Sequence, residues 1–221
     1  RGEGVCPADC GLCGQHLSGS VLAQIDLTNR CNMRCPICFA NAGAAGYVCE
    51  PSFEQHVAHL QRLRDFRPIP CTAIQFTGGE PTIHPDFLRI VEAARSMGFS
   101  HIQIATNGIR MADYEFARQA AEAGLHTLYL QFDGVGPDAY RQTRNYPGIW
   151  EKKLAAVENC RRLDLKICLV PTIVRGMNDD QVEPIFRFAV DNIDTVSAIS
   201  YQPVAFTGRI YYEQRSRQRH T

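Results

Sequence analysis

The amino-acid sequence predicts an α/β protein with a parallel sheet of six strands. Six short apolar segments alternate with segments whose apolar residues recur at helical spacing, a pattern typical of strand–helix–strand units. Polar or glycine-bearing residues directly follow several of the apolar segments, as expected where ligand sites gather at the carboxyl ends of parallel strands. The length of 221 residues suffices for one domain with a full core.

The expected strands show either period-2 alternation or continuous apolar runs. The strand TAIQFT leads into Gly-Gly-Glu, and the two strands after it end in Thr-Asn-Gly and in Gln-Phe-Asp-Gly. Right-handed crossovers bring such strand ends to one edge of a sheet, so we expect the ligand site there. The six expected strands are 21–27, 72–77, 101–105, 125–132, 166–174 and 195–202.

Capping residues delimit the expected helices. Ser52 and Gln55 form a capping-box pair at the start of a helix over 51–67. Pro85 at a first helical position and Gly98 just past the end bracket a second helix, and Gly124 closes a third over 112–123. Two more helices are expected, one around Trp150 to Cys160 and one that begins at Asp179 and Asp180.

The composition is that of an ordinary soluble protein, with 45% hydrophobic and 21% charged residues. A formal net charge of zero argues against a nucleic-acid partner or a polybasic membrane surface. No stretch approaches the ~18 apolar residues of a transmembrane helix, and the first residues contain no apolar signal-peptide region. Ten cysteines without a secretory signal place the chain in a reducing compartment, the cytoplasm.

Three cysteines follow the first expected strand at C-x3-C-x2-C spacing: Cys31, Cys35 and Cys38. Thiols packed this closely suit a metal or an iron–sulfur cluster better than disulfides. A [4Fe–4S] cluster normally takes four cysteines, and this loop offers three. The fourth iron would then stay open to a reacting ligand, which predicts a catalytic site.

This cysteine spacing, followed by FTGGEP after the second strand, resembles the radical S-adenosylmethionine (SAM) superfamily. The resemblance implies a partial barrel of six βα units, with the cluster on the three cysteines. It also implies that Gly78, Gly79 and Glu80 hold the amino group of SAM. Two glycines allow a ligand to approach the backbone closely, and exposed N–H groups there can cradle it. The residue before the last cysteine is commonly aromatic in the superfamily, but here it is Ile37.

The resemblance implies further SAM contacts at strand ends. Asn107 and Gln131 stand where related enzymes contact the methionine carboxylate or the ribose, and Thr106 and Thr172 are further candidates. Arg144 matches a position that often carries an arginine near the carboxylate, which a guanidinium can grip with two hydrogen bonds. Without the resemblance, Asn107-Gly108 reads as an ordinary turn.

A second cysteine group lies in residues 1–20, where Cys6, Cys10, Cys13 and His16 form C-x3-C-x2-C-x2-H. We expect an auxiliary iron–sulfur cluster or a structural zinc or iron site, with His16 as a possible fourth ligand. A solvated histidine or a local disulfide is the alternative. The domain organisation expected from the sequence is a cysteine-rich extension over 1–20, a core over 21–205, and a solvated basic tail or the start of a further segment over 206–221.

Membership of the superfamily would imply an enzyme that cleaves SAM reductively to a 5′-deoxyadenosyl radical, which abstracts hydrogen from an unactivated C–H bond. The electron would come from a flavodoxin or a ferredoxin. The combined motifs resemble the archaeal tetraether-lipid synthase-like branch, which implies C–C coupling of lipid chains. Alternatives are the modification of a pterin, a peptide or another small substrate, including methylation, and a non-catalytic module that binds two metal clusters.

Overall fold

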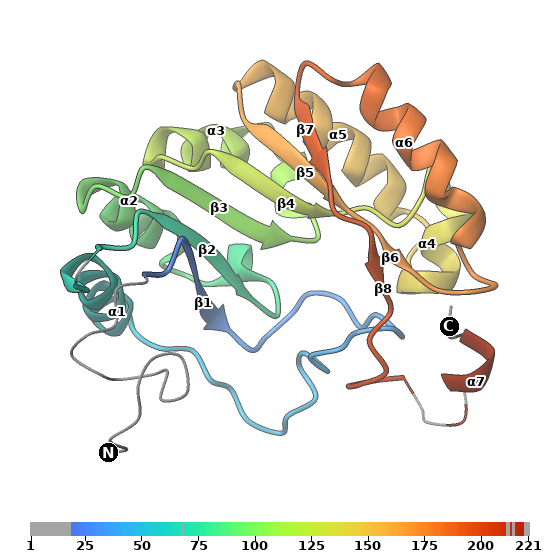
Figure 1. Ribbon diagram of the computed structural model, residues 1–221, viewed down its shortest axis with the longest axis horizontal. Helices are drawn as coiled ribbons and strands as arrows, with labels where there is room; N and C mark the ends of the chain where they lie inside the picture. Colours follow the sequence, from blue (N-terminus) through green and yellow to red (C-terminus); the bar gives the residue numbers. More distant parts are fainter. Residues whose placement is uncertain (1–18, 68, 211–212, 214, 219–221) are drawn as a thin grey trace, which may run out of the picture.

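The expected parallel sheet of six strands is confirmed by the computed structural model, which describes residues 19–67, 69–210, 213 and 215–218 (Figure 1). Neighbouring strands pair in parallel in the order β1-β2-β3-β4-β5-β7. Within the described residues, no helix combines the length and the apolar composition that crossing a bilayer requires. The strands are β1 (Leu22–Thr28), β2 (Ala73–Gly78), β3 (His101–Thr106), β4 (Thr127–Gln131), β5 (Lys166–Val170) and β7 (Val196–Ile199).

The last two expected strands are each divided in the structure. Residues 166–174 form β5 and a separate short strand, β6 (Thr172–Ile173), because Pro171 between them has no N–H group to continue the ladder. Residues 195–202 likewise form β7 and then β8 (Gln202–Pro203), which pairs with β6. The two short strands β6 and β8 thus lie beyond the carboxyl ends of β5 and β7, where the ligand site is expected.

The expected helix ends are confirmed at two caps and corrected at a third. Ser52 and Gln55 form the capping box of α1, and Gly124 closes α3 in the left-handed conformation. The second helix begins two residues after Pro85, because the backbone N–H of Phe87 bonds to the carbonyl of His84 and holds residues 84–86 in a turn. The helices are α1 (Phe53–Asp65), α2 (Phe87–Ser96), α3 (Tyr114–Ala123), α4 (Pro137–Arg144), α5 (Ile149–Arg162), α6 (Val182–Asp191) and α7 (Arg215–Gln218), with 3₁₀ turns at η1 (Pro81–Ile83), η2 (Arg110–Ala112) and η3 (Asp179–Gln181).

The helix α4 is absent from the sequence-based expectation although its signals are readable. Gly136 precedes it with φ of 111°, Pro137 occupies its first turn, and Asn145 ends it in the left-handed conformation. This helix matters for function because Arg144 lies in its last turn.

One face of the sheet builds the core and the opposite face is polar. Ile74 and Phe76 of β2 are fully buried, and the same alternation in β3, β4 and β5 supplies the apolar side chains that helices cover. On the opposite face, Gln75 accepts a hydrogen bond from Gln103, and the Tyr129 hydroxyl donates to Ser200 at 2.9 Å. Strand period therefore separates a dry core from a face that can hydrogen-bond a ligand.

The chain after β8 packs against the loop that follows β1, which we call the cysteine loop (residues 29–42) (Figure 1). Ile37 of the loop is buried with Val174, Val204 and Ile210 in a small apolar cluster. We call residues 204–210 the closing segment. The expectation of a solvated tail from residue 206 is thus wrong for Ile210, which is only 8% exposed because it fills this cluster.

Candidate functional site

A cavity of about 240 Å³ lies where the carboxyl ends of the strands meet the cysteine loop. The apolar part of its wall comes mainly from the loop, including Ile37 and Phe39, and from Val170 at the end of β5, Pro203 of β8 and Ala205. The residues that the sequence predicts to bind the cluster or SAM, within the described part of the chain, all line this cavity. These residues are Cys31, Cys35, Cys38, Gly78, Gly79, Glu80, Thr106, Asn107, Gln131, Arg144 and Thr172.

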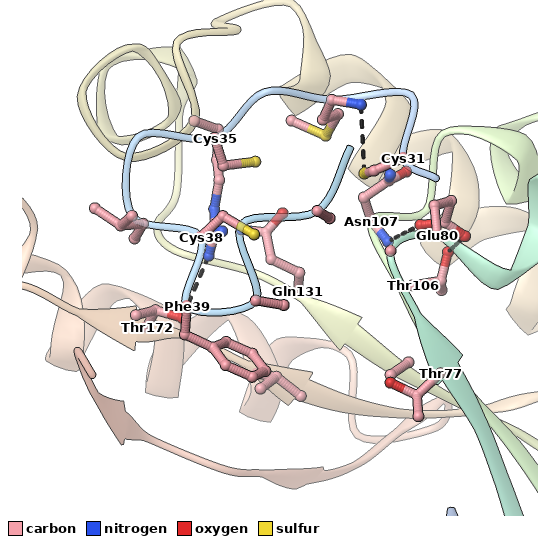
Figure 2. A pocket seen from close by; sticks show the side chains of 18 of the residues that line it. Cys31, Cys35, Cys38, Phe39, Thr77, Glu80, Thr106, Asn107, Gln131 and Thr172 are labelled. Carbon is pink, nitrogen blue, oxygen red and sulfur yellow. Dashed lines mark hydrogen bonds between the residues drawn. The ribbon is translucent and has the colours of Figure 1, made fainter. Parts of the chain in front are cut away.

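The three cysteines are free and half-buried around the cavity (Figure 2). Burial raises the pKa of Cys31 to about 11, and the Glu80 carboxylate adds to the effect, although a hydrogen bond from the Met33 N–H to Sγ at 3.4 Å opposes it. Across the described residues, no three His, Cys, Asp or Glu side chains converge closely enough to hold a metal ion. Thiols spaced around a cavity suit ligands to separate irons of a cluster better than ligands to one ion.

Positions 78 and 79 require glycine, because the end of β1 and the start of the cysteine loop leave no room for a side chain. A Cβ on Gly78 would lie 2.3 Å from the Thr28 carbonyl oxygen, and one on Gly79 would lie 2.0 Å from the Arg30 carbonyl oxygen. The N–H of Gly79 donates to Thr28 at 2.8 Å, and the N–H of Glu80 donates to Arg30 at 2.9 Å. The N–H groups of Gly79 and Glu80 are therefore engaged by the end of β1 and the start of the cysteine loop, and the binding of SAM by this element stays a prediction.

The Glu80 carboxylate is buried at the cavity wall, beside Cys31 (Figure 2). Its Oε1 accepts hydrogen bonds from the N–H and hydroxyl of Thr82 and, at 2.8 Å, from the hydroxyl of Thr106. From the described residues Oε2 accepts one, from the Asn107 N–H at 2.7 Å. Because Oε1 accepts three hydrogen bonds and Oε2 only this one, Oε2 retains capacity for a cationic donor in the cavity.

Asn107 connects three parts of the site. Its backbone N–H binds Glu80, its Nδ2 donates to Asn32 of the cysteine loop at 2.7 Å, and its Oδ1 accepts from the Ile109 N–H at 3.0 Å. Both ends of the side chain are thus engaged by protein. The geometry supports an anchoring role for Asn107 at least as well as the direct ligand contact expected from the sequence.

Arg144 forms a two-hydrogen-bond ion pair with a carboxylate of the protein itself, that of Asp133. Its Nε and Nη2 donate to the two oxygens of Asp133, and Nη2 also donates to the hydroxyl of Thr172 at 3.3 Å. The pair is almost completely buried, with 10% of the Arg144 side chain exposed and none of Asp133. Burial alone would raise the pKa of Asp133, but the charge and hydrogen bonds of Arg144 hold it below its usual value. The predicted contact of Arg144 with a ligand carboxylate stays a prediction: Asp133, two residues after the end of β4, occupies the Nε and Nη2 side of the guanidinium, and Arg144 still lines the cavity.

Two further residues shape the site, and neither is assigned to it from the sequence. Arg209 of the closing segment donates to the carbonyls of Cys35, at 3.2 Å, and Ala42, and to Oδ1 of Asn41, at 3.0 Å. Its own N–H binds the Cys38 carbonyl at 3.0 Å. A Cβ on Gly208 would lie 2.2 Å from that same oxygen. Arg209 therefore fastens the cysteine loop, which contradicts the expectation that it belongs to a solvated tail.

Lys153 of α5 is the other of these two residues. It is fully buried, and its ammonium group donates to the carbonyls of Asn107 and Gln131 and to Oε1 of Gln131. Burial lowers the pKa of Lys153 to about 7. A lysine on a helix usually reaches solvent, so only the observed fold reveals this contact.

The comparisons with known proteins agree with this geometry. A family model described as the Radical SAM superfamily matches residues 25–189. The 7,8-dihydro-6-hydroxymethylpterin dimethyltransferase of Methanocaldococcus jannaschii is 48% identical over 206 residues, which are 93% of this chain and 40% of that protein. The GTP 3',8-cyclase of Limosilactobacillus fermentum is 27% identical over 183 residues, 82% of this chain and 54% of the cyclase. The chain thus spans 40% and 54% of the length of these two relatives.

Solved structures of other proteins share the fold. Streptococcus suis SuiB bound to S-adenosylmethionine has a TM-score of 0.71 and 15% identity, over 85% of this chain and 41% of that one. Methylornithine synthase (PylB) has a TM-score of 0.66 and 16% identity, over 85% of this chain and 54% of that one. The expected resemblance to a tetraether-lipid branch gains no support from the two curated relatives, which are named for a pterin and a nucleotide. Cys6, Cys10, Cys13 and His16 lie outside the described residues, and so does any metal site that they form.

Proposed function

The chain belongs to the radical SAM superfamily, and we propose that Cys31, Cys35 and Cys38 hold a [4Fe–4S] cluster that binds and cleaves SAM. The observation that carries the proposal is the meeting of three half-buried free thiols with a buried carboxylate, Glu80, at one cavity. When bound, the cluster supplies the electron for reductive cleavage of the sulfonium, which yields a 5′-deoxyadenosyl radical for hydrogen abstraction.

The donor set fits this cofactor. Three sulfur ligands leave one iron of a four-iron cluster for a non-protein ligand. The thiol of Cys31 is neutral when metal-free because burial raises its pKa to about 11, and bound iron would favour the thiolate. The N–H of Met33 donates to the same sulfur at 3.4 Å, and such hydrogen bonds tune the reduction potential of a cluster.

The cavity residues also suit SAM, which carries an ammonium, a carboxylate and a ribose. Oε2 of Glu80 accepts a single hydrogen bond from the described residues and can receive the ammonium group. Gln131 also lines the cavity, with its Nε2 buried and its Oε1 bound by Lys153. The apolar side chains of Ile37 and Val170 in the cavity wall exclude water from the reacting groups.

For the substrate, we propose a reduced pterin or a similar small heterocycle, modified by methylation. The proposal rests on the name of the 48% identical relative, a 7,8-dihydro-6-hydroxymethylpterin dimethyltransferase. Hydrogen-bonding side chains on the open face of the sheet, such as Tyr129 and Gln202, agree with a polar substrate. Coupling of lipid chains is the competing hypothesis, since much of the cavity wall is apolar.

We extend the proposal to the partners and to the second cysteine group. A flavodoxin or a ferredoxin would deliver the electron, which places the protein in the reducing cytoplasm. Cys6, Cys10 and Cys13 would hold an auxiliary iron–sulfur cluster or a zinc or iron ion, with His16 as a candidate ligand.

The cleavage reaction can be tested on the full chain after anaerobic reconstitution with iron and sulfide. We expect 5′-deoxyadenosine after addition of dithionite and SAM, and none from the triple variant Cys31→Ala, Cys35→Ala, Cys38→Ala. Cys49→Ala is the matched control, because Cys49 is exposed and free and does not line the cavity. A protein that binds only zinc and releases no 5′-deoxyadenosine would instead support a non-catalytic metal-binding module.

The substrate proposal can be tested separately in the same reaction. Added 7,8-dihydro-6-hydroxymethylpterin should increase the rate of 5′-deoxyadenosine release and gain methyl mass by mass spectrometry. An archaeal diether lipid in detergent serves as the comparison. Acceleration by the lipid with no change to the pterin would reject the pterin and favour chain coupling.

A further inference from the structure

Lys153 is a lysine buried completely between helix α5 and the floor of the cavity. Its ammonium group donates to the Asn107 carbonyl at 2.6 Å, to the Gln131 carbonyl, and to Oε1 of Gln131 at 2.8 Å. All three hydrogens are used, and every acceptor is neutral. Among the described residues, Lys153 forms no ion pair.

The acceptors belong to the ends of two adjacent strands. Gln131 is the last residue of β4, and Asn107 directly follows β3. Lys153 therefore ties these two strand ends together from the side opposite the cavity. It does not line the cavity itself.

The contact with Asn107 extends to the rest of the site. The backbone N–H of Asn107 donates to Glu80 at 2.7 Å, and its side chain donates to Asn32 in the cysteine loop at 2.7 Å. Asn32 directly follows Cys31. One buried ammonium group is thus linked, through a single residue, to the Glu80 carboxylate and to the loop that carries the three thiols.

The contact with Gln131 determines which end of its amide is free. Because Oε1 is bound to Lys153, the end without a partner among the described residues is the donor Nε2. Nε2 is itself buried, so the contact with Lys153 fixes the position of Gln131 in the cavity wall and does not expose a donor to a ligand.

Burying this amine removes its charge from water, which destabilises the folded state, and the need to fill space does not require a charged side chain here. Removal from water lowers the pKa of Lys153 to about 7; Arg144 also lowers it, whereas Asp133 and Glu80 raise it. An apolar side chain of similar length would fill the same space without that desolvation. Strongly shifted pKa values are more frequent at functional sites, so this lysine is a candidate for a role in the site.

We propose that Lys153 is a positioning residue: without touching SAM, it holds Asn107 and Gln131 in the arrangement that binds it. The inference rests on the proposed function of the cavity. It predicts that the loss of the ammonium group weakens SAM binding more than it affects the cluster or the reaction of bound SAM.

The test uses the reconstituted full chain and measures the dissociation constant for SAM by titration calorimetry. We expect Lys153→Met to raise this constant at least tenfold. Iron content should be unchanged, and the rate of 5′-deoxyadenosine release at saturating SAM should stay within about threefold. The matched control is Lys152→Met, the same substitution at the exposed neighbour on the same helix, which should leave the constant within twofold.

A second variant keeps the proposal testable if methionine impairs folding. Lys153→Gln retains a neutral N–H₂ donor and should show a smaller loss of affinity than methionine. The proposal is overturned if a folded Lys153 variant binds SAM as the wild type does, or if both variants fail to fold, which would make the role structural. If the wild type itself binds no SAM, the proposed function fails, and that outcome is distinct from equal binding by wild type and variant.

Discussion

Removing Arg144 should destabilise the protein by about 3–5 kcal/mol, because it leaves the Asp133 carboxylate buried without its counter-charge. Asp133 is fully buried and accepts hydrogen bonds from Arg144 through both oxygens, so no water can replace the guanidinium without rearrangement. We expect Arg144→Met and Asp133→Asn each to be strongly destabilising. The double variant removes both charges of this pair, and the amide oxygen introduced by Asp133→Asn can still accept the Thr172 N–H that Asp133 binds at 3.0 Å. It should therefore cost less than either single variant.

Urea denaturation of the metal-free full chain, followed by circular dichroism, measures these differences. The matched control is Arg187→Met, which breaks an exposed pair with Glu183 and should change stability by about 0.5 kcal/mol or less. In Arg144→Met the pKa of Asp133 should rise with burial, so the folded state takes up a proton more readily than the unfolded state. The difference in free energy of unfolding between wild type and Arg144→Met should then shrink as the pH falls from 8 to 5. The buried-pair argument would be refuted if Arg144→Met lost less than about 1 kcal/mol of unfolding free energy. It would also be refuted if the loss in the double variant equalled the sum of the losses in the two single variants.

Three more predictions concern the surroundings of the cavity. The pKa of Lys153 is about 7 in the folded state, far below that of a free lysine. Below pH 7 the folded state therefore contains the buried charged amine and is destabilised by it, and this destabilisation decreases as the pH rises and the amine loses its proton. The free energy of unfolding of wild type relative to Lys153→Met should therefore increase by about 1.4 kcal/mol per pH unit between pH 8 and 10, whereas a flat difference would contradict the buried amine. Gly208→Ala places a Cβ 2.2 Å from the Cys38 carbonyl oxygen, and we expect iron retained after reconstitution to fall by at least half; normal iron content would show that the loop tolerates displacement. Arg209→Met removes three side-chain hydrogen bonds to the cysteine loop, and its cluster should bleach faster in air than that of wild type by visible absorbance; equal rates would argue against the fastening role.

The sequence predicts those parts of the protein that depend on local pattern. Strand and helix periods predict the parallel sheet, and the capping box at Ser52 predicts where α1 begins. The cysteine spacing and Gly-Gly-Glu predict residues that all line one cavity. Each of these signals lies within a few residues of chain, where composition and spacing constrain the structure directly.

The remaining features depend on contacts between distant segments. Arg209 meets Cys35 across 174 positions of sequence, and no local pattern marks either residue for that contact. Lys153 resembles any surface lysine of a helix until the register of α5 turns it inward. The close approach of the Gly-Gly element to the backbone of Thr28 and Arg30 is likewise a contact between distant segments that the sequence does not show. The helix α4 is different, because Gly136 and Pro137 are local signals from which it could have been predicted.

The most direct test of the central claim is the yield of 5′-deoxyadenosine per chain from reconstituted, dithionite-reduced protein supplied with SAM. The account predicts release by the wild type and by Cys49→Ala. It predicts none from the variant in which Cys31, Cys35 and Cys38 are alanine, together with the loss of about four irons per chain. Continued release of 5′-deoxyadenosine by that variant, with its iron content unchanged, would contradict the account.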